Sequence, residues 1–348
     1  MEECPDAVII GEPEATALEF ARAAADGKKL DGISGIVYRN GKKIIRNSPR
    51  PPIEDLDSLP FPAWDLVNRD LYRMPLTNRR FLLITTARGC PHACDFCADT
   101  TFYGRKLRAR SPAKVADEME HVREKYGINE FLFWSESFTL DRKHAEAMAD
   151  ELIRRGGGFR WVCNSRVDGV DDALVLKFRD AGCWMIGFGF ETGDEATLRR
   201  MKKGTTLRQA EEAVAACRRH GVEATGHFVI GYPGETEESA GRTAEFAKKL
   251  NLDFAQFYCA VPFPGSPLYE RAKAKGWLAT NDWRKFEQNM CVLKVDGATP
   301  EDVEKWRRSA YLKFYANPAR ALKILGRIRS PGDAMGIIKG LREFISWI

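Results

Sequence analysis

The chain has 348 residues, 44% of them hydrophobic and 30% charged, which is enough for the core of one large domain or two ordinary ones and argues against disorder. Its net charge of +5 is spread along the chain and permits an anionic partner without naming one. The N-terminal MEECPDAVII lacks the basic start of a secretory signal, and no apolar run approaches the roughly 20 residues of a membrane span. We therefore expect a cytoplasmic protein.

Residues 1–48 have the pattern of a small α/β unit. The pattern predicts a strand, a turn, an Ala-rich helix and a two-stranded hairpin about Asn40 and Gly41, at residues 6–10, 11–13, 14–27, 33–38 and 43–46. These elements are too few to make a core alone. The proline-rich residues 49–78 predict an extended linker without regular structure, and we place a domain boundary there.

From residue 79 to residue 280, short apolar runs alternate with amphipathic helices. Strands are predicted at 81–86, 130–134, 160–163, 184–190, 224–230 and 253–259. Helices are predicted at 111–126, 142–154, 171–181, 206–220 and 238–250, the first with Ser111 as its N-cap and Pro112 at its first position. Six alternations predict an α/β fold with a parallel sheet, an open, partial (β/α)6 TIM-like barrel with polar residues, Gly and Pro at the carboxyl ends of its strands.

Residues 281–348 are expected to form a helical C-terminal extension, with a strong helix start at Thr299 and Pro300. Its last part interleaves basic residues with apolar ones, which are Leu322, Leu325, Ile328, Ile337, Ile338, Leu341, Phe344 and Ile345. This pattern is compatible with peripheral contact at a membrane near a lipid-like substrate. Packing of the segment against the barrel is the alternative.

Three cysteines, Cys90, Cys94 and Cys97, follow the first predicted barrel strand with the spacing Cys-x3-Cys-x2-Cys. Thiolates are soft ligands suited to iron–sulfur clusters or zinc, and a short loop lets them converge on one centre. A structural zinc site needs a fourth ligand, and His92 would be strained in that role because it lies between two of the cysteines. Three ligands on a four-iron cluster leave one iron open for a small molecule. The isolated cysteines, interpreted as small buried hydrophobic residues, are Cys163, Cys183, Cys217, Cys259 and Cys291.

This cysteine motif at the end of a first barrel strand, with Phe96 before the last cysteine, resembles the signature of radical S-adenosylmethionine (SAM) enzymes. The resemblance covers residues 81–277. It implies a [4Fe-4S] cluster, SAM bound at the open iron, and an electron donor of the flavodoxin or ferredoxin type. It also implies reductive cleavage of SAM to methionine and a 5′-deoxyadenosyl radical that abstracts hydrogen from a substrate.

Later motifs match the family position by position. Ser135 and Glu136, in FLFWSESF, match the positions that meet the SAM ammonium, with a solvated loop as the alternative. Arg166, in VCNSRVD, matches a family position that engages the SAM carboxylate, with a surface salt bridge as the alternative. Glu191, in GFGFETG, matches a ribose ligand, whereas Gly187 and Gly189 make only a weak dinucleotide fingerprint. In HFVIGYPGET, Ile230 and Gly231 match positions beside the adenine, and a simple turn would also explain Gly231.

The stretches PFPGSPLYE, RPPIEDLDSLPFPAWDL and GEPE resemble the subgroup whose radical domain follows a cobalamin-binding domain. Residues 1–48 resemble only the last strand and helix of such a domain. The lower-ligand motif Asp-x-His-x-x-Gly does not occur in the sequence. Cobalamin binding by this chain is therefore doubtful, unless a partner chain or upstream sequence supplies it.

The leading hypothesis is a radical SAM enzyme that abstracts hydrogen from a small-molecule or lipid-like substrate, with no catalytic side chain assigned. Cobalamin-assisted methyl transfer is the alternative, and cyclisation or rearrangement also stays open. Methylthiolation of tRNA would need a second cluster, and only Cys4 lies upstream. A zinc-binding nucleic-acid module would need a fourth ligand and aromatic residues among basic ones. Neither is evident, so no nucleic acid is expected.

Overall fold

A six-stranded parallel sheet forms the centre of the computed structural model, which describes the chain except residues 1–4, 76, 295–296, 318–325, 327–333 and 339–348. The strands are β4 (Leu82–Thr85), β7 (Glu130–Trp134), β8 (Arg160–Ser165), β9 (Cys183–Glu191), β10 (Glu223–Ile230) and β11 (Phe254–Cys259). They lie side by side in chain order, and every neighbouring pair is parallel. The predicted partial TIM-like barrel is therefore confirmed.

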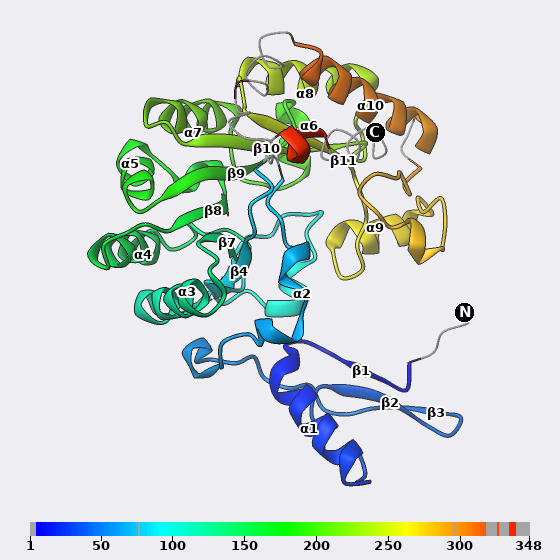
Figure 1. Cartoon of the computed structure of the whole chain (residues 1–348). Helices are drawn as coiled ribbons and strands as arrows, with labels where there is room; N and C mark the ends of the chain where they lie inside the picture. The colour runs from blue at the N-terminus through cyan, green and yellow to red at the C-terminus, as the bar shows by residue number, and fades with distance from the viewer. Residues whose placement is uncertain (1–4, 76, 295–296, 318–325, 327–333, 339–348) are drawn as a thin grey trace.

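Helices cover the outer side of this curved sheet (Figure 1). They are α3 (Pro112–Tyr126), α4 (Arg142–Arg154), α5 (Asp172–Asp180), α7 (Leu207–Arg219) and α8 (Glu237–Lys249). Alternate strand residues such as Phe131, Phe133 and Trp161 point into the core between sheet and helices, where each is at most 1% exposed. The Ser111 side chain accepts a hydrogen bond from the Lys114 backbone N–H, which confirms the predicted cap. The intervening residues of each strand are left for the inner, concave face.

Helix α10 (Pro300–Tyr315), which follows the sheet in the chain, packs over its last strands. Its Tyr311 hydroxyl accepts a hydrogen bond from the Phe257 backbone N–H at 3.0 Å, and its Tyr315 hydroxyl donates one to the Ala255 carbonyl at 3.0 Å. The predicted capping signal is present at Thr299, whose side chain accepts from the Asp302 backbone N–H. This helix therefore closes the core beside β11.

The N-terminal residues form a small sheet of β1 (Ala7–Ile9), β2 (Ile36–Asn40) and β3 (Lys43–Arg46), with α1 (Pro13–Ala25) against it. All its pairs are antiparallel, and its core is small, consisting of Ala23, Ile33, Ile36 and Tyr38. In Figure 1 this unit lies below the barrel. In the linker the expectation of no regular structure was wrong in detail, because three single 3-10 turns form there: η1 (Leu56–Ser58), η2 (Trp64–Leu66) and η3 (Arg69–Leu71).

Several short elements were not predicted, because a few residues give no periodic signal. They are β5 (Ala87–Arg88), β6 (Arg108–Ala109), α2 (Asp99–Tyr103), α6 (Glu195–Arg200), α9 (Pro267–Lys275) and η5 (Trp283–Lys285), besides η4 (Val167–Gly169). None of the helices in the described part of the chain combines the length and hydropathy that a membrane span requires. Of the apolar residues in the expected membrane-contact segment, Ile337 is buried and Ile338 is exposed, and the others lie outside the described residues.

Candidate cluster and cofactor site

The three motif cysteines lie on the loop that follows β4, at the carboxyl edge of the sheet, and all three are half-buried. Gly89 begins the loop with a φ of +92°, and a Cβ there would meet the Lys106 carbonyl oxygen at 2.2 Å, so only glycine fits. The Cys90 backbone N–H donates to the Gly104 carbonyl at 3.2 Å, and the Cys97 N–H donates to the Cys94 carbonyl at 3.2 Å. The backbone therefore holds the thiols on one compact turn.

Asp95, between these cysteines, anchors the loop to the rest of the barrel. Its carboxylate is 1% exposed and accepts two hydrogen bonds from the Arg271 guanidinium of α9, at 2.6 and 2.7 Å. It also accepts one from the Tyr232 hydroxyl at 2.6 Å. Burial would raise the pKa of Asp95, but these hydrogen bonds and the Arg271 charge hold it below its usual value. Sequence reasoning missed this anchor, because its members lie far apart in the chain.

The half-buried thiols are affected both by burial and by nearby charges of either sign. Burial raises the pKa of Cys90 and Cys94, and burial together with the Asp99 carboxylate raises that of Cys97 to about 12. The charges of Lys203 and Arg166 act in the opposite direction on Cys94. No group of three His, Cys, Asp or Glu side chains in the described ranges is arranged to hold a single metal ion. Because these thiols are protonated near neutral pH, cluster binding must displace their protons.

Ser135 and Glu136 follow directly after β7. One Glu136 carboxylate oxygen accepts a hydrogen bond from the Gly89 backbone N–H at 3.1 Å, which ties this residue to the start of the cysteine loop. Its other oxygen and the Ser135 hydroxyl are buried and have no hydrogen-bond partner among the described residues. Burial accordingly raises the pKa of Glu136. Two unsatisfied acceptors next to the cysteine loop are suited to a cation that binds there.

Arg166 follows β8 and is buried, but its guanidinium is already engaged. It forms a bidentate ion pair with the Asp168 carboxylate, at 2.9 and 2.8 Å, and donates a hydrogen bond to the Lys203 carbonyl at 2.9 Å. The salt bridge that the sequence left as the alternative is thus present, although it is not on the open surface. Arg166, Asp168 and His92 line a small pocket of about 150 Å³ at this edge of the sheet.

Glu191, the last residue of β9, is buried and pairs with Lys203, whose ammonium lies 2.6 Å from its carboxylate. Its φ of +65° is unusual for a residue with a side chain, and such strain is concentrated at functional sites. The same ammonium lies 5.9 Å from the centre of the Phe96 ring. Lys203 therefore links two predicted site residues, and no motif in the sequence pointed to it.

Ile230 and Gly231 lie at the end of β10. Ile230 is fully buried in the core, and Gly231 has a φ of +83°. A Cβ at Gly231 would meet Cγ1 of Val303, in α10, at 2.3 Å. The Gly231 backbone N–H donates a hydrogen bond to the buried Glu235 carboxylate at 2.5 Å. Turn geometry and the close approach of α10 thus explain why position 231 is a glycine.

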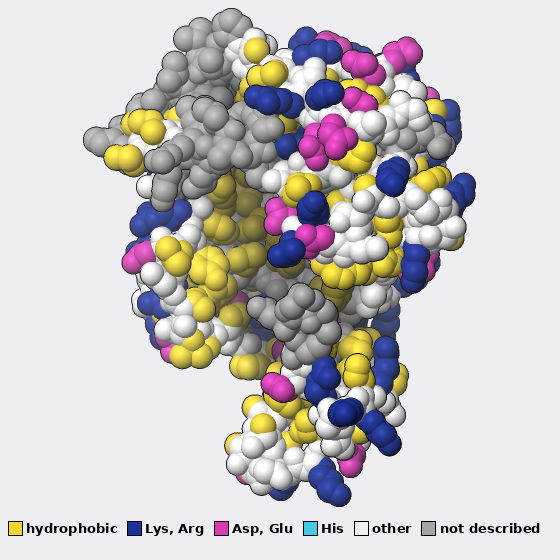
Figure 2. Space-filling model, turned by 90° about the vertical axis from the view of Figure 1, so that its right-hand side faces the viewer, with side chains coloured by type: hydrophobic (Ala, Val, Ile, Leu, Met, Phe, Trp, Pro, Cys, Tyr) yellow, Lys and Arg dark blue, Asp and Glu magenta, His cyan; other side chains and the backbone are white. Residues whose placement is uncertain are grey.

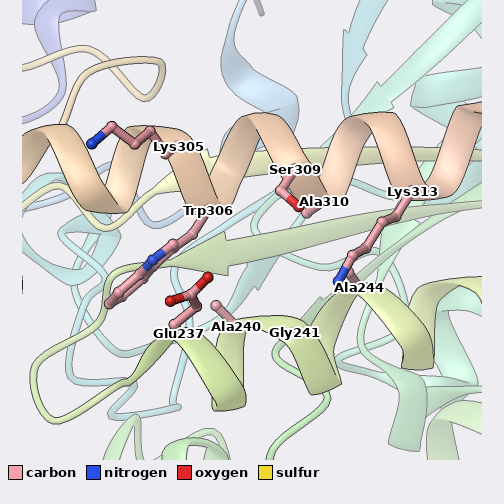
Figure 3. A pocket seen from close by; sticks show the side chains of 9 residues that line it. All are labelled: Glu237, Ala240, Gly241, Ala244, Lys305, Trp306, Ser309, Ala310 and Lys313. Carbon is pink, nitrogen blue, oxygen red and sulfur yellow. The ribbon is translucent and has the colours of Figure 1, made fainter.

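A second hollow, of about 200 Å³, lies away from this edge, between α8 and α10 (Figure 3). Glu237 and Trp306 approach each other at one end and Lys313 lies at the other. Small residues such as Ala240 and Ala310 let the two helices pack closely there. None of the predicted site residues lines this hollow.

Comparison with known proteins identifies the family. Residues 84–247 match the model of the radical SAM superfamily. Over 325 residues the chain is 36% identical to an uncharacterized methyltransferase of Pyrococcus horikoshii, covering 93% of this chain and 70% of that protein. The chain belongs to the radical SAM superfamily. Members of this superfamily are enzymes that bind a [4Fe-4S] cluster and SAM.

Two further similarities concern more distant proteins. Over 327 residues this radical SAM protein is 30% identical to an anaerobic magnesium-protoporphyrin IX monomethyl ester cyclase of Rubrivivax gelatinosus, covering 92% of this chain and 58% of the cyclase. Its fold matches the radical SAM methyltransferase TsrM of Kitasatospora setae, whose structure holds cobalamin and a [4Fe-4S] cluster. That match has a TM-score of 0.68 at 20% identity and covers 90% of this chain and 68% of TsrM. These relatives thus differ in the reactions that their names state.

The donor set of this radical SAM chain fits both cofactors. Three thiols on one turn are the soft ligands that an iron–sulfur cluster requires. Next to that turn, the buried Ser135 hydroxyl and one Glu136 oxygen have no hydrogen-bond partner in the part of the chain that the structure describes. Two other predicted contacts, Arg166 and Glu191, are paired within the protein and would have to exchange partners.

Proposed function

We propose that Cys90, Cys94 and Cys97 hold the [4Fe-4S] cluster and that the chain uses it to cleave SAM reductively. The observation that carries the proposal is the position of the three thiols, on one loop at the carboxyl edge of the sheet, next to unsatisfied Ser135 and Glu136. When bound, the cluster supplies the electron that cleaves SAM to methionine and a 5′-deoxyadenosyl radical, which takes a hydrogen atom from a small-molecule or lipid-like substrate.

The side chains around the cysteine loop would orient SAM. Ser135 and Glu136 accept hydrogen bonds from its ammonium, which satisfies two buried oxygens. Arg166 binds its carboxylate once it releases Asp168, and Glu191 binds the ribose hydroxyls while Lys203 balances its charge. Ile230 and Gly231 shape the adenine side, and Phe96 shields the loop. Each of these roles follows from the family resemblance.

Cobalamin-assisted methyl transfer is the second candidate. It is favoured by relatives named as methyltransferases and by the fold match to a cobalamin-containing methyltransferase. The described residues offer no Asp-x-His-x-x-Gly ligand for cobalamin, so a partner or a further segment would have to supply that site.

We also propose that the chain is divided into four parts, residues 1–48, 49–78, 79–280 and 281–348. Its electron donor is a protein of the flavodoxin or ferredoxin type.

Product analysis distinguishes the two candidates. Anaerobically reconstituted protein is incubated with SAM and dithionite, and 5′-deoxyadenosine and S-adenosylhomocysteine are quantified. Hydrogen abstraction predicts 5′-deoxyadenosine, whereas methyl transfer predicts S-adenosylhomocysteine when cobalamin and a methyl acceptor are supplied. If a sample that retains its iron and its absorption near 400 nm forms neither of these products, catalysis by this chain is refuted.

A further inference from the structure

The inner face of the barrel carries a polar cluster that none of the cofactor roles uses. The side of the molecule that the helices leave open is hollowed, and hydrophobic side chains line the hollow (Figure 2). Strand alternation places Asn164 of β8, His227 of β10, and Gln256 and Tyr258 of β11 on the inner face, opposite the core residues Cys163, Phe228 and Phe257. We call these four residues the inner polar cluster.

Gly187 of β9 makes room for two members of the cluster. It lies between Asn164 on β8 and Thr225 on β10 in the strand register. A Cβ at Gly187 would lie 2.3 Å from the Asn164 amide oxygen and 3.2 Å from Nε2 of His227. The amide and the imidazole therefore converge over one point above this glycine. Any larger residue there would push them apart.

Hydrogen bonding fixes which nitrogen of His227 carries the proton. The Tyr258 hydroxyl gives its one hydrogen to the Gln256 amide oxygen, so in its contact with Nδ1 of His227, 3.1 Å away, the Tyr258 oxygen accepts from Nδ1–H. The two rings are stacked, with 5.9 Å between centroids and 11° between planes. Burial lowers the pKa of His227, which keeps the imidazole neutral near pH 7. Nε2 is thus a hydrogen-bond acceptor, and it lies toward Asn164.

Among the described residues, no charged side chain stands in the middle of the inner face of β8 to β10. On the inner face of β8 to β10, the charged Arg160 and Glu223 stand at the amino ends. Glu191 stands at the carboxyl end of β9, where Lys203 neutralises it. The inward positions between these ends are uncharged, among them Val162, Met185 and Thr225. An uncharged lining favours an uncharged ligand, because an ion would lose its hydration without gaining a counter-charge.

We propose that the inner polar cluster binds the substrate of this enzyme, and that the substrate presents an uncharged O–H or N–H group to Nε2 of His227, with Asn164 beside it. This inference rests on the proposed radical SAM function and deepens it, since it names the chemical class of the group that the barrel recognises. His227 is then a substrate-binding residue that determines specificity.

Small aromatic probes test this proposal. Calorimetric titration of reconstituted, SAM-loaded protein compares phenol, which has an uncharged O–H, with anisole, in which a methyl group replaces that hydrogen, and with benzoate, which is charged. Phenol should bind about tenfold more tightly than either, which is the effect of one hydrogen bond. His227→Phe should abolish this preference and leave anisole binding unchanged. His220→Phe, at a histidine that pairs with Asp172 on the outer side, is the matched control and should retain the preference.

Equal binding of phenol and anisole by the wild-type protein would overturn the proposal, even if the His227→Phe variant fails to fold. So would absence of measurable phenol binding, or a preference that survives in a folded His227→Phe variant. Production of 5′-deoxyadenosine is scored on the same samples. Its absence would refute the proposed function and not the probe preference, so the two failures are distinguishable.

Discussion

The cysteines in the described part of the chain occupy two kinds of environment. Cys90, Cys94 and Cys97 are half-buried on one loop, whereas Cys163, Cys183, Cys217, Cys259 and Cys291 are buried in apolar surroundings, as the sequence predicted. Exposure to an incoming metal thus separates the proposed ligands from the cysteines that only fill space.

Removal of one ligand should release the cluster. We expect Cys90→Ala, Cys94→Ala or Cys97→Ala to lose most of the iron after anaerobic reconstitution, because two thiolates cannot hold the cluster. Cys217→Ala, on the buried face of α7, should retain it. Iron content per chain measures both, and equal losses in the two sets would refute the assignment.

Glu235 should make stability fall as the pH rises. Burial raises its pKa to about 8 from 4.5, so the folded protein binds a proton that the unfolded chain releases. The stabilising effect is complete below about pH 4.5 and is lost between there and about pH 8, on the order of 5 kcal/mol in the free energy of unfolding. Glu235→Gln should flatten this dependence. Denaturant titrations near pH 5 and near pH 8 measure it, and parallel profiles for both proteins would contradict the explanation.

Single residues were only partly predictable. The cysteine spacing predicted the loop and its position, because ligand type and spacing are local properties. The pairing of Arg166 with Asp168, and of Glu191 with Lys203, depends on side-chain directions that a linear pattern does not encode. The roles of these residues toward SAM stay predictions.

At the scale of elements, α9 fixes the cysteine loop through Arg271. Arg271→Ala would leave the buried Asp95 carboxylate without its counter-charge. We expect a loss of about 2–3 kcal/mol in the free energy of unfolding, a value reduced because the Arg271 side chain is 33% exposed. Cluster content should fall as well. Arg284→Ala, at a pair that is largely in solvent, should change stability by less than about 0.5 kcal/mol; similar losses in both variants would contradict this view of the anchor.

The end of β10 is held against α10 by a close approach at Gly231. Gly231→Ala should destabilise the fold by about 2–4 kcal/mol, because its φ is positive and the new methyl group would overlap Val303. Adding Val303→Ala should relieve the overlap, so the double variant should lose less stability than the sum of the single ones. Gly241→Ala in α8, where nothing lies within 4 Å, should be neutral or stabilising. Additive losses at positions 231 and 303 would refute the contact.

Long elements were predicted well and short ones were not. The strand Glu130–Trp134 and the helix Arg142–Arg154 have the predicted bounds, since their apolar residues repeat with a clear period. The helices Asp99–Tyr103 and Glu195–Arg200 span one or two turns, and tertiary contacts decide whether so short a segment is helical.

At the scale of the whole molecule, the N-terminal unit is joined to the strands that flank the cysteine loop, β5 and β6, by one buried and one half-buried ion pair. Glu12 pairs with Arg108, and Glu14 pairs with Arg88, which lies two residues before Cys90. The Arg108 guanidinium also donates to the Ile53 carbonyl of the linker. The proposed boundary between the N-terminal unit and the barrel is therefore bridged close to the proposed cluster. Sequence patterns predicted both units, but they could not show this contact because it joins residues distant in the chain.

The central claim is that three thiols hold a [4Fe-4S] cluster with one iron left for SAM. Electron paramagnetic resonance of the dithionite-reduced, reconstituted protein, recorded with and without saturating SAM, tests it most directly. We predict the signal of a reduced [4Fe-4S] cluster whose g-values shift when SAM is added, because SAM becomes a ligand of the open iron. A cluster signal that SAM leaves unchanged, or stoichiometric zinc without any cluster signal, would contradict the claim.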